Sequence, residues 1–268
     1  MSFDFFSLKL DESSKENAER FGMKFSAGGV HQRRTMMLAE ISTLMNLNDS
    51  KGFSINDYKS AVIERNVLGK KTATTKRETF KHLKELYLLS DAFKLFHAYR
   101  ILMLIDPESA PLLSLLAAWS RDPLLRASTE VMLDLREGES LPNGGMQSSL
   151  QLAFPGTQSQ STVHAAASRV ASTWTQSGHF SGKVRKIRQI VKPRPASLAF
   201  ALYLAHVTGI DGERLFSSIW CRLLDLSASP AREMAARAHR EGLLTLKALG
   251  STVEVSFPMF DANHGGTA

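Results

Sequence analysis

Residues 70–87 read KKTATTKRETFKHLKELY, and this stretch decides how the N-terminal half of the chain is expected to fold. The hydroxyl side chains at 72–75 can cap a helix, because they accept hydrogen bonds from first-turn amides that have no partner within the helix. The apolar residues that follow recur at helical spacing and define a buried face: Phe80, Leu83 and Tyr87. We therefore predict a helix that begins near Thr74 and ends near Leu89.

The opposite face of this helix is basic. Between Lys70 and Lys84 there are six Lys or Arg and one acidic residue, Glu78. The candidate DNA contacts in this segment are Thr74, Thr75, Lys76, Arg77, Lys81 and Lys84. Three of these cations recur at i, i+4 and i+7, so they form one stripe turned away from the apolar face. A solvated surface face is the alternative interpretation.

The segment before this helix predicts a helix-turn-helix. Ser54 can cap a helix over 55–65, and the break after Asn66 is short. The second helix would then present hydroxyls and cations at its start, where free amides and the helix dipole favour a phosphate. In helix-turn-helix proteins the second helix lies in the major groove of DNA.

Further helices are predicted on both sides of this unit. The expected ranges are 30–47, 91–105, 107–120 and 123–136, with a turn at 48–52. Asp106-Pro107 and Asp122-Pro123 open two of these helices, because Asp caps free amides and Pro at the first helical position loses no hydrogen bond. The stretch GGVHQRR at 28–34 is expected to be a plain surface turn; an anion held between its cations is the weaker alternative.

The composition changes in the middle of the chain. From Ser140 to Ser168 there is no Asp, Glu, Lys or Arg, and Ser, Gln, Gly and Pro are frequent. Long stretches of this kind inside one compact domain are uncommon. We therefore predict two helical domains, 1–139 and 163–268, joined by an uncharged linker at 140–162.

The second domain begins with a helix over 163–176 and a basic segment. Residues 179–191 alternate in a way typical of a strand or ribbon, although the spacing also permits a helix. The segment from Lys183 to Arg194 holds six Lys or Arg and no acid. Candidate phosphate contacts here are Lys183, Arg185, Lys186 and Arg188. An exposed loop beside a core strand is the alternative.

The C-terminal elements follow the order of a winged helix. Helices are expected at 196–208, 212–225 and 228–240, followed by a hairpin whose strands, 243–247 and 252–257, flank residues 249–251. The candidate contacts to DNA on the third helix and the wing are Arg232, Arg237, Arg240 and Lys247. Because winged helices also dock proteins, a protein-binding role is the alternative.

Composition and motifs argue against several classes of protein. The 268 residues carry 33 Lys and Arg against 26 Asp and Glu, a net charge of +7 that favours a polyanionic partner. One cysteine, Cys221, excludes an internal disulfide. No local pair of histidines, nucleophile elbow or complete phosphate loop is present, so we expect no enzyme, metal or cofactor. The longest uncharged apolar stretch, 195–210, is shorter than the ~20 residues that a membrane span needs.

Four short motifs occur in an order that resembles a known family: FSAGG at 25–29, MLAEI at 37–41, ERNVL at 64–68 and TTKR at 74–77. Together they are similar to the small BrxA-type component of BREX bacteriophage-defence systems. The likeness covers mainly residues 24–90 and is looser in the C-terminal half. It implies a helical, non-catalytic DNA-binding protein with helix-turn-helix-like modules.

The sequence thus predicts a mainly α fold in two domains with a small C-terminal hairpin wing. The expected function is non-enzymatic binding of double-stranded DNA as an accessory of phage defence. The expected partners are duplex DNA and other BREX components, with no membrane and no small-molecule substrate, in the cytoplasm. The alternative is a helical adaptor that holds other defence components without touching DNA.

Overall fold

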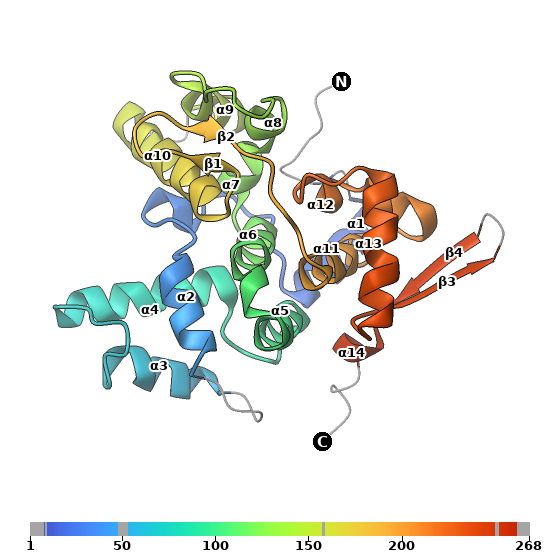
Figure 1. Ribbon diagram of the computed structural model, residues 1–268. Helices are drawn as coiled ribbons and strands as arrows, with labels where there is room; N and C mark the ends of the chain where they lie inside the picture. The colour runs from blue at the N-terminus through green and yellow to red at the C-terminus, as the bar shows by residue number, and fades with distance from the viewer. Residues whose placement is uncertain (1–7, 9, 48–52, 157–158, 250–251, 262–268) are drawn as a thin grey trace.

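The computed structural model describes residues 8, 10–47, 53–156, 159–249 and 252–261, and these are mainly helical (Figure 1). The first half contains α1 (Glu12–Phe21), η1 (Val30–Gln32), α2 (Leu38–Met45), α3 (Ile55–Ile63), α4 (Ala73–Tyr87), α5 (Lys94–Ile105), η2 (Pro107–Ser109), α6 (Ala110–Arg121), α7 (Pro123–Ala127) and α8 (Thr129–Leu133), where η denotes a 3₁₀-helix. The second half contains α9 (Gly145–Ala153), α10 (Gln160–Gln176), β1 (Phe180–Ser181), β2 (Ile187–Arg188), α11 (Pro195–Val207), η3 (Gly212–Ser217), α12 (Ile219–Arg222), α13 (Ala228–Arg240), β3 (Thr245–Leu249), β4 (Thr252–Ser256) and α14 (Pro258–Asp261). The mainly α prediction is confirmed.

Two central helices, α6 and α11, organise the hydrophobic core. Helix α11 is apolar around its whole circumference, and every residue in it except His206 is buried. It packs against α5 and α6 on one side and against α12 and α13 on the other. The rings of Trp119 and Trp220 meet edge to face with centroids 4.7 Å apart, joining α6 to α12. Such a helix can only be stable inside a core that surrounds it.

Three of the predicted helix starts are confirmed by their caps. The Ser54 hydroxyl accepts a hydrogen bond from the Asp57 amide at 3.3 Å. The Asp57 carboxylate accepts one from the Ser54 amide at 2.8 Å, and the two bonds together form a capping box. Thr72 caps α4 by accepting from the Thr75 amide at 3.1 Å. Asp122 accepts from the Leu124 amide at 2.9 Å before Pro123. Each of these satisfies a first-turn amide that would otherwise lack a partner.

The helix expected over 30–47 is broken in the middle. Only 30–32 and 38–45 are helical, and Met37 has a φ of 53°. The intervening backbone is held by side chains from elsewhere: Thr173 accepts from the Met36 amide at 2.9 Å, and Tyr87 donates to the Met36 carbonyl at 2.6 Å. Tertiary hydrogen bonds therefore replace the helical ones that the local sequence favours. The turn expected at 48–52 lies outside the described residues.

Two other expected helices are also divided. The range 123–136 forms α7 and α8, which meet at Ser128. The Ser128 hydroxyl donates to the Leu125 carbonyl at 2.7 Å and accepts from the Trp174 indole at 2.8 Å. The range 212–225 forms η3 and α12, with Ser218 extended between them. In both places a serine lies at the break. Ser128 bonds to a backbone carbonyl three residues before it, which competes with the regular helix.

The segment predicted as a linker contains a helix. Within 140–162, α9 buries Met146 and Leu150, and it packs against α10 and α7. The buried apolar residues on both sides of this segment belong to one hydrophobic cluster. The division into two domains stays a prediction, and a test of it is given in the Discussion.

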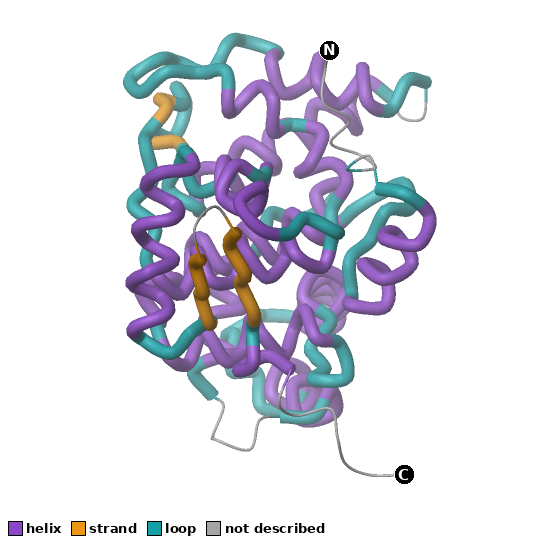
Figure 2. Tube along the Cα trace, turned by 90° about the vertical axis from the view of Figure 1, so that its right-hand side faces the viewer, coloured by secondary structure: helices purple, strands orange, loops and turns teal. Residues whose placement is uncertain are grey.

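The C-terminal hairpin is confirmed. Strands β3 and β4 pair antiparallel, with Thr245 opposite Ser256 and Leu249 opposite Thr252. Val253 and Val255 are buried on one face, as their alternation predicts. The ribbon projects from the side of the molecule next to α13 (Figures 1 and 2). Residues 250–251, at its turn, lie outside the described residues.

Candidate nucleic-acid interface

Helices α3 and α4 form one edge of the molecule, at the left of Figure 1. They pack against each other, and residues 64–72 connect them. Asn66 adopts a left-handed conformation with φ 51°, and its side-chain oxygen accepts a hydrogen bond from the Lys70 amide at 2.9 Å. Asn tolerates this conformation better than most residues, so it redirects the chain after α3 toward α4. Two packed helices are thus present where the sequence predicts them, but nine residues connect them instead of the short break that the sequence predicts.

The predicted basic stripe lies on the exposed face of α4. Arg77, Lys81 and Lys84 are all exposed, while Leu83 and Tyr87 on the opposite face are fully buried. Phe80 is half-buried, and so is Lys76. Within the part of the chain that the structure describes, none of the three stripe cations forms an ion pair with a carboxylate. Their charge is therefore available to a partner.

The acidic residues of α4 are occupied by other groups. Glu78 lies 3.4 Å from His82, and Glu85 lies 3.4 Å from Lys24. Burial lowers the pKa of His82, the charge of Arg34 lowers it further, and Glu78 and Glu85 oppose this shift. The imidazole therefore adds little positive charge at neutral pH, and the stripe depends on Arg and Lys.

The two candidate hydroxyls at the start of α4 differ in their surroundings. Thr74 is exposed. The Thr75 hydroxyl lies 2.8 Å from the Thr72 hydroxyl, so the two share a hydrogen bond at the cap. A hollow of about 510 Å³ adjoins the stripe and is lined by Lys81 and Lys84 as well as by Glu85.

The second basic segment forms a tight turn between two short strands. Strands β1 and β2 pair antiparallel, so the predicted ribbon is present, although each strand has two residues. Lys183 and Arg185 are exposed and Lys186 is half-buried. Val184, between them, is 96% exposed.

Arg188 corrects the prediction of a continuous basic ribbon. Its side chain is 2% exposed and forms a buried ion pair with Asp225. Asp225 also accepts a hydrogen bond from the Val191 amide at 2.9 Å. The carboxylate holds this buried guanidinium in place. Arg188 is therefore not accessible to a phosphate of DNA. The alternating pattern of the sequence does not distinguish this inward arginine from its outward neighbours.

The cations of the C-terminal unit are partly neutralised by neighbouring carboxylates. Arg232 lies 3.2 Å from Glu213, and Lys247 lies 3.8 Å from Glu254 on the facing strand. Arg237 is exposed, and so is Arg240 at the end of α13. This unit and the α3–α4 edge lie on opposite sides of the molecule (Figure 1). The structure therefore does not bring the two predicted helical surfaces together.

A buried chain of hydrogen bonds lies where the sequence indicated a surface turn. His31 Nδ1 lies 2.8 Å from an Asp122 carboxylate oxygen, and His31 Nε2 lies 2.8 Å from the Thr173 hydroxyl. All three side chains are completely buried. Burial alone would raise the pKa of Asp122, but the charge of His31 and its hydrogen bonds outweigh burial and lower it. This chain of contacts joins η1, the residue that caps α7, and α10.

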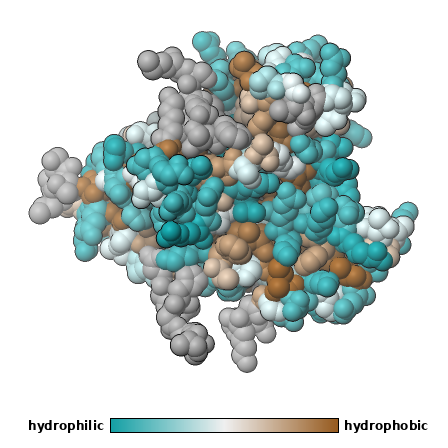
Figure 3. Space-filling model, turned by 180° about the vertical axis from the view of Figure 1, so that it is seen from behind, coloured by the Kyte–Doolittle hydropathy of each residue, from teal (hydrophilic) through white to brown (hydrophobic). Residues whose placement is uncertain are grey.

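The remaining surface is mixed in character. Figure 3 shows the back of the molecule as largely hydrophilic, with hydrophobic residues gathered mainly in its lower central part. None of the described helices combines the length and the apolar character that a membrane crossing requires. The described residues also hold no group of three or more His, Cys, Asp or Glu side chains arranged to bind a metal ion. No protein-family model matches the chain, and no curated protein sequence matches it.

Proposed function

We propose that the protein binds duplex DNA through α4, without catalysing a reaction. The observation that carries this proposal is the stripe of Arg77, Lys81 and Lys84, which is exposed and free of ion pairs among the described residues. Each such cation can neutralise one phosphate and release counterions from DNA. Two of the other candidate cations, Arg232 and Lys247, already have a carboxylate partner.

The length of the stripe suits a DNA groove. Arg77 and Lys84 are seven residues apart, which at 1.5 Å per residue is about 10 Å along the helix axis. The major groove is ~12 Å wide, so cations at the two ends of the stripe can reach phosphates on either side of it. The exposed Thr74, at the start of the helix, adds a hydroxyl donor. Contacts of this kind position the protein and carry no direct sequence information.

The proposed biological setting is bacteriophage defence in the cytoplasm, with other BREX components as partners. This part of the proposal rests on the four ordered motifs within residues 25–77 that resemble the BrxA-type family. The last of these motifs, at 74–77, contains the start of the stripe. The alternative, an adaptor that binds protein only, makes the opposite prediction for the experiment below.

The test is charge reversal of the stripe. We expect the triple variant Arg77→Glu, Lys81→Glu, Lys84→Glu to lose affinity for every duplex sequence tested at low salt, as measured by fluorescence anisotropy. If each cation neutralises one phosphate, the slope of log affinity against log salt should become shallower by about 2.7 units. The thermal midpoint should move little, because these side chains face away from the core.

The matched control is the triple variant Arg232→Glu, Arg237→Glu, Arg240→Glu on α13. It makes the same change in net charge on another exposed helix. We expect it to weaken DNA binding less than the α4 variant does. If the α13 variant alone loses binding, the contact belongs to the C-terminal unit, and the α4 assignment is wrong. If neither folded variant loses binding, the adaptor alternative is the better one.

A further inference from the structure

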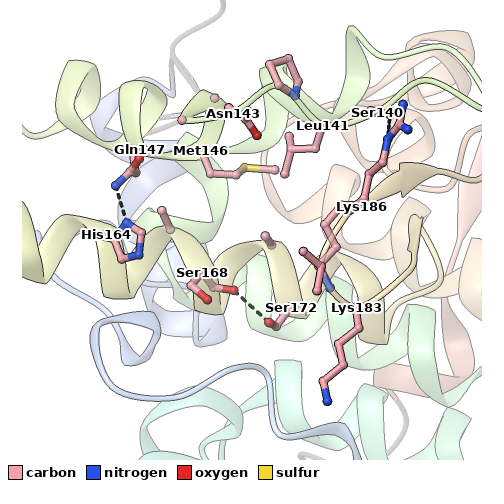
Figure 4. Close-up of a pocket in the computed structure, with 17 residues that line it drawn as sticks. Ser140, Leu141, Asn143, Met146, Gln147, His164, Ser168, Ser172, Lys183 and Lys186 are labelled. Atoms are coloured by element: carbon pink, nitrogen blue, oxygen red, sulfur yellow. Dashed lines mark hydrogen bonds between the residues drawn. The ribbon is translucent and has the colours of Figure 1, made fainter.

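A cavity of about 780 Å³ lies away from α4, between α9, α10 and the β1–β2 turn (Figure 4). Residues 140–147 form one wall, a face of α10 forms the floor, and the turn at 183–186 closes the third side. The walls are tied together, because the Leu141 amide donates to the Lys186 carbonyl at 2.9 Å. The segment predicted to be a linker and the basic segment therefore build one site.

The cavity is lined by three cations and no carboxylate: Lys183, Arg185 and Lys186. The other walls are neutral, because residues 140–168 contain no charged side chain apart from the ionisable His164. Across the described ranges, none of the three cations forms an ion pair. Unpaired positive charges around one hollow attract anions, because the walls supply no counter-charge.

Hydrogen bonds hold two of these cations, Arg185 and Lys186, at the turn. Arg185 Nε donates to the Ser140 hydroxyl at 2.7 Å, which uses one of the five N–H groups of the guanidinium. Lys186 Nζ donates to the Gly182 carbonyl at 2.9 Å. Gly182 has a φ of 87°, and a Cβ there would lie 2.1 Å from the Arg185 carbonyl oxygen, so only glycine fits this turn. Burial lowers the pKa of Lys186.

The first turn of α9 also borders the cavity. Gly144 occupies the N-cap position with φ 74°, and no side chain caps the helix. Residues 144–147 line the cavity. Backbone amides at a helix start carry partial positive charge and favour an anion, which adds to the three cations.

The far end of the cavity has no Lys, Arg, Asp or Glu and can form hydrogen bonds. Gln147 and His164 are joined at 2.7 Å there, and the apolar side chains of Leu141 and Met146 lie between this pair and the lysines (Figure 4). A volume of 780 Å³ equals a cube with an edge of about 9 Å. A duplex cannot enter such a space, since its major groove alone is ~12 Å wide.

We propose that this cavity binds the phosphate of a single nucleotide, with the nucleoside lying toward Gln147 and His164. The size is within the ~300–1,000 Å³ of small-molecule sites. A free nucleotide and an unpaired nucleotide of a nucleic-acid strand offer the same chemistry. The proposal goes beyond duplex binding by α4 and does not depend on it.

The experiment titrates the full chain with three probes by calorimetry: AMP, adenosine and a ten-residue oligothymidylate. We expect AMP to bind at least about tenfold more tightly than adenosine, because charge-assisted hydrogen bonds to phosphate supply the affinity. The double variant Arg185→Ala, Lys186→Ala should weaken AMP binding by at least about tenfold. Arg237→Ala, Arg240→Ala removes two exposed cations on α13 and should leave AMP binding unchanged.

Each outcome decides the question. If AMP binding to the wild type is too weak to measure but the cavity variant loses oligothymidylate binding, the proposal is supported. The nucleotide that occupies the cavity then belongs to an unpaired strand. Equal affinity for AMP and adenosine, equal loss in the α13 control, or no binding of any probe overturns it. If the double variant does not fold, Lys183→Ala provides the same comparison, because that exposed side chain takes part in no hydrogen bond of the described structure. The α4 charge-reversal variant should keep AMP binding, so failure of one proposal does not imply failure of the other.

Discussion

His179 is a buried histidine that the fold keeps neutral. Its Nε2 lies 3.0 Å from the Leu223 carbonyl and its Nδ1 lies 2.8 Å from the Ser177 hydroxyl. A carbonyl only accepts, so Nε2 carries the proton. Burial lowers the pKa of His179 to about 4, and the charge of Asp225 opposes this shift only in part.

The first prediction follows from this pKa. The unfolded histidine has a pKa near 6.5, so below that pH the unfolded state binds a proton that the folded state does not. The free energy of unfolding should therefore be highest above pH 6.5 and fall between pH 6.5 and 4. A shift from about 6.5 to about 4 corresponds to about 3 kcal/mol. Urea denaturation of the wild type and of His179→Gln at pH 7, 6, 5 and 4 measures the difference.

Comparison of the wild type with the His179→Gln variant controls for the other titrating groups. Carboxylates that protonate in this range act on both proteins, so only the additional loss in the wild type belongs to His179. The variant should be less stable at pH 7, because it changes the hydrogen bonds to Ser177 and Leu223. Parallel pH profiles for the two proteins would contradict the assignment.

Single residues with distant partners were the hardest to predict from the sequence. His31 bonds to Asp122 and Thr173, which are 91 and 142 positions away. Arg188 pairs with Asp225, 37 positions away. In each case the local pattern fits a surface residue, and only the tertiary partner shows that the side chain is buried. The close approach of Gly29 to the Asp122 carboxylate, where a Cβ would lie 2.2 Å from an oxygen, likewise has no local signal.

The contribution of the N-cap of α4 to stability can be tested directly by mutation. Replacing Thr72 with Ala removes the acceptor of the Thr75 amide and should reduce the free energy of unfolding by about 1 kcal/mol. Thr74→Ala is the matched control, because Thr74 is exposed and does not cap. We expect no loss of stability there, since Ala is the better helix former. Urea midpoints of the two variants provide the comparison, and equal losses would show that the cap is not the cause.

The elements that the sequence predicted well combine a cap with apolar residues at helical spacing. Helices α3 and α4 belong to this group. Helix α1 was missed although Asp11 caps it by accepting from the Ser14 amide at 2.7 Å, because its charged residues hide a short apolar face. Helix α9 was missed because its Ser- and Gln-rich composition is typical of a linker. Its two buried residues, Met146 and Leu150, are too few to give a periodic signal.

At the scale of the whole molecule, the core crosses the predicted domain boundary. Tyr99 meets Phe200 with ring centroids 6.4 Å apart, and Trp119 meets Trp220. Arg194 also pairs with Asp106 at 2.8 Å. The two aromatic contacts join residues 1–139 to residues 163–268 through buried apolar surface, and the ion pair joins them at the surface. The two halves are therefore expected to depend on each other for stability.

The third prediction is that the chain unfolds in a single transition. Tryptophan fluorescence reports on Trp119, Trp174 and Trp220, and far-UV circular dichroism reports on all helices. The two signals should change at the same urea concentration, because one core holds both halves. Two resolved transitions would instead support the independent domains that the composition change predicts.

The charge pattern was predictable at this scale, but the arrangement of the charges was not. Both the uncharged segment from residue 140 and the basic segment from residue 183 are plain in the sequence. Nothing in the sequence places them side by side, because α10 separates them along the chain and the β1–β2 turn brings them together again. The stripe on α4 could be predicted because helical spacing is local, whereas the cavity depends on three segments that meet only in the fold.

The burial of every residue of α11 except His206 has a consequence for hydrogen–deuterium exchange. Its backbone amides, from Leu198 onward, are bonded within the helix, and every residue of the helix except His206 is buried, so we expect local opening to expose them rarely. Their exchange should require unfolding of the whole molecule. Deuterium uptake in this one peptide therefore measures global stability in every variant described here. A variant that loses DNA or nucleotide binding while α11 exchanges at the wild-type rate has lost a contact and kept its fold.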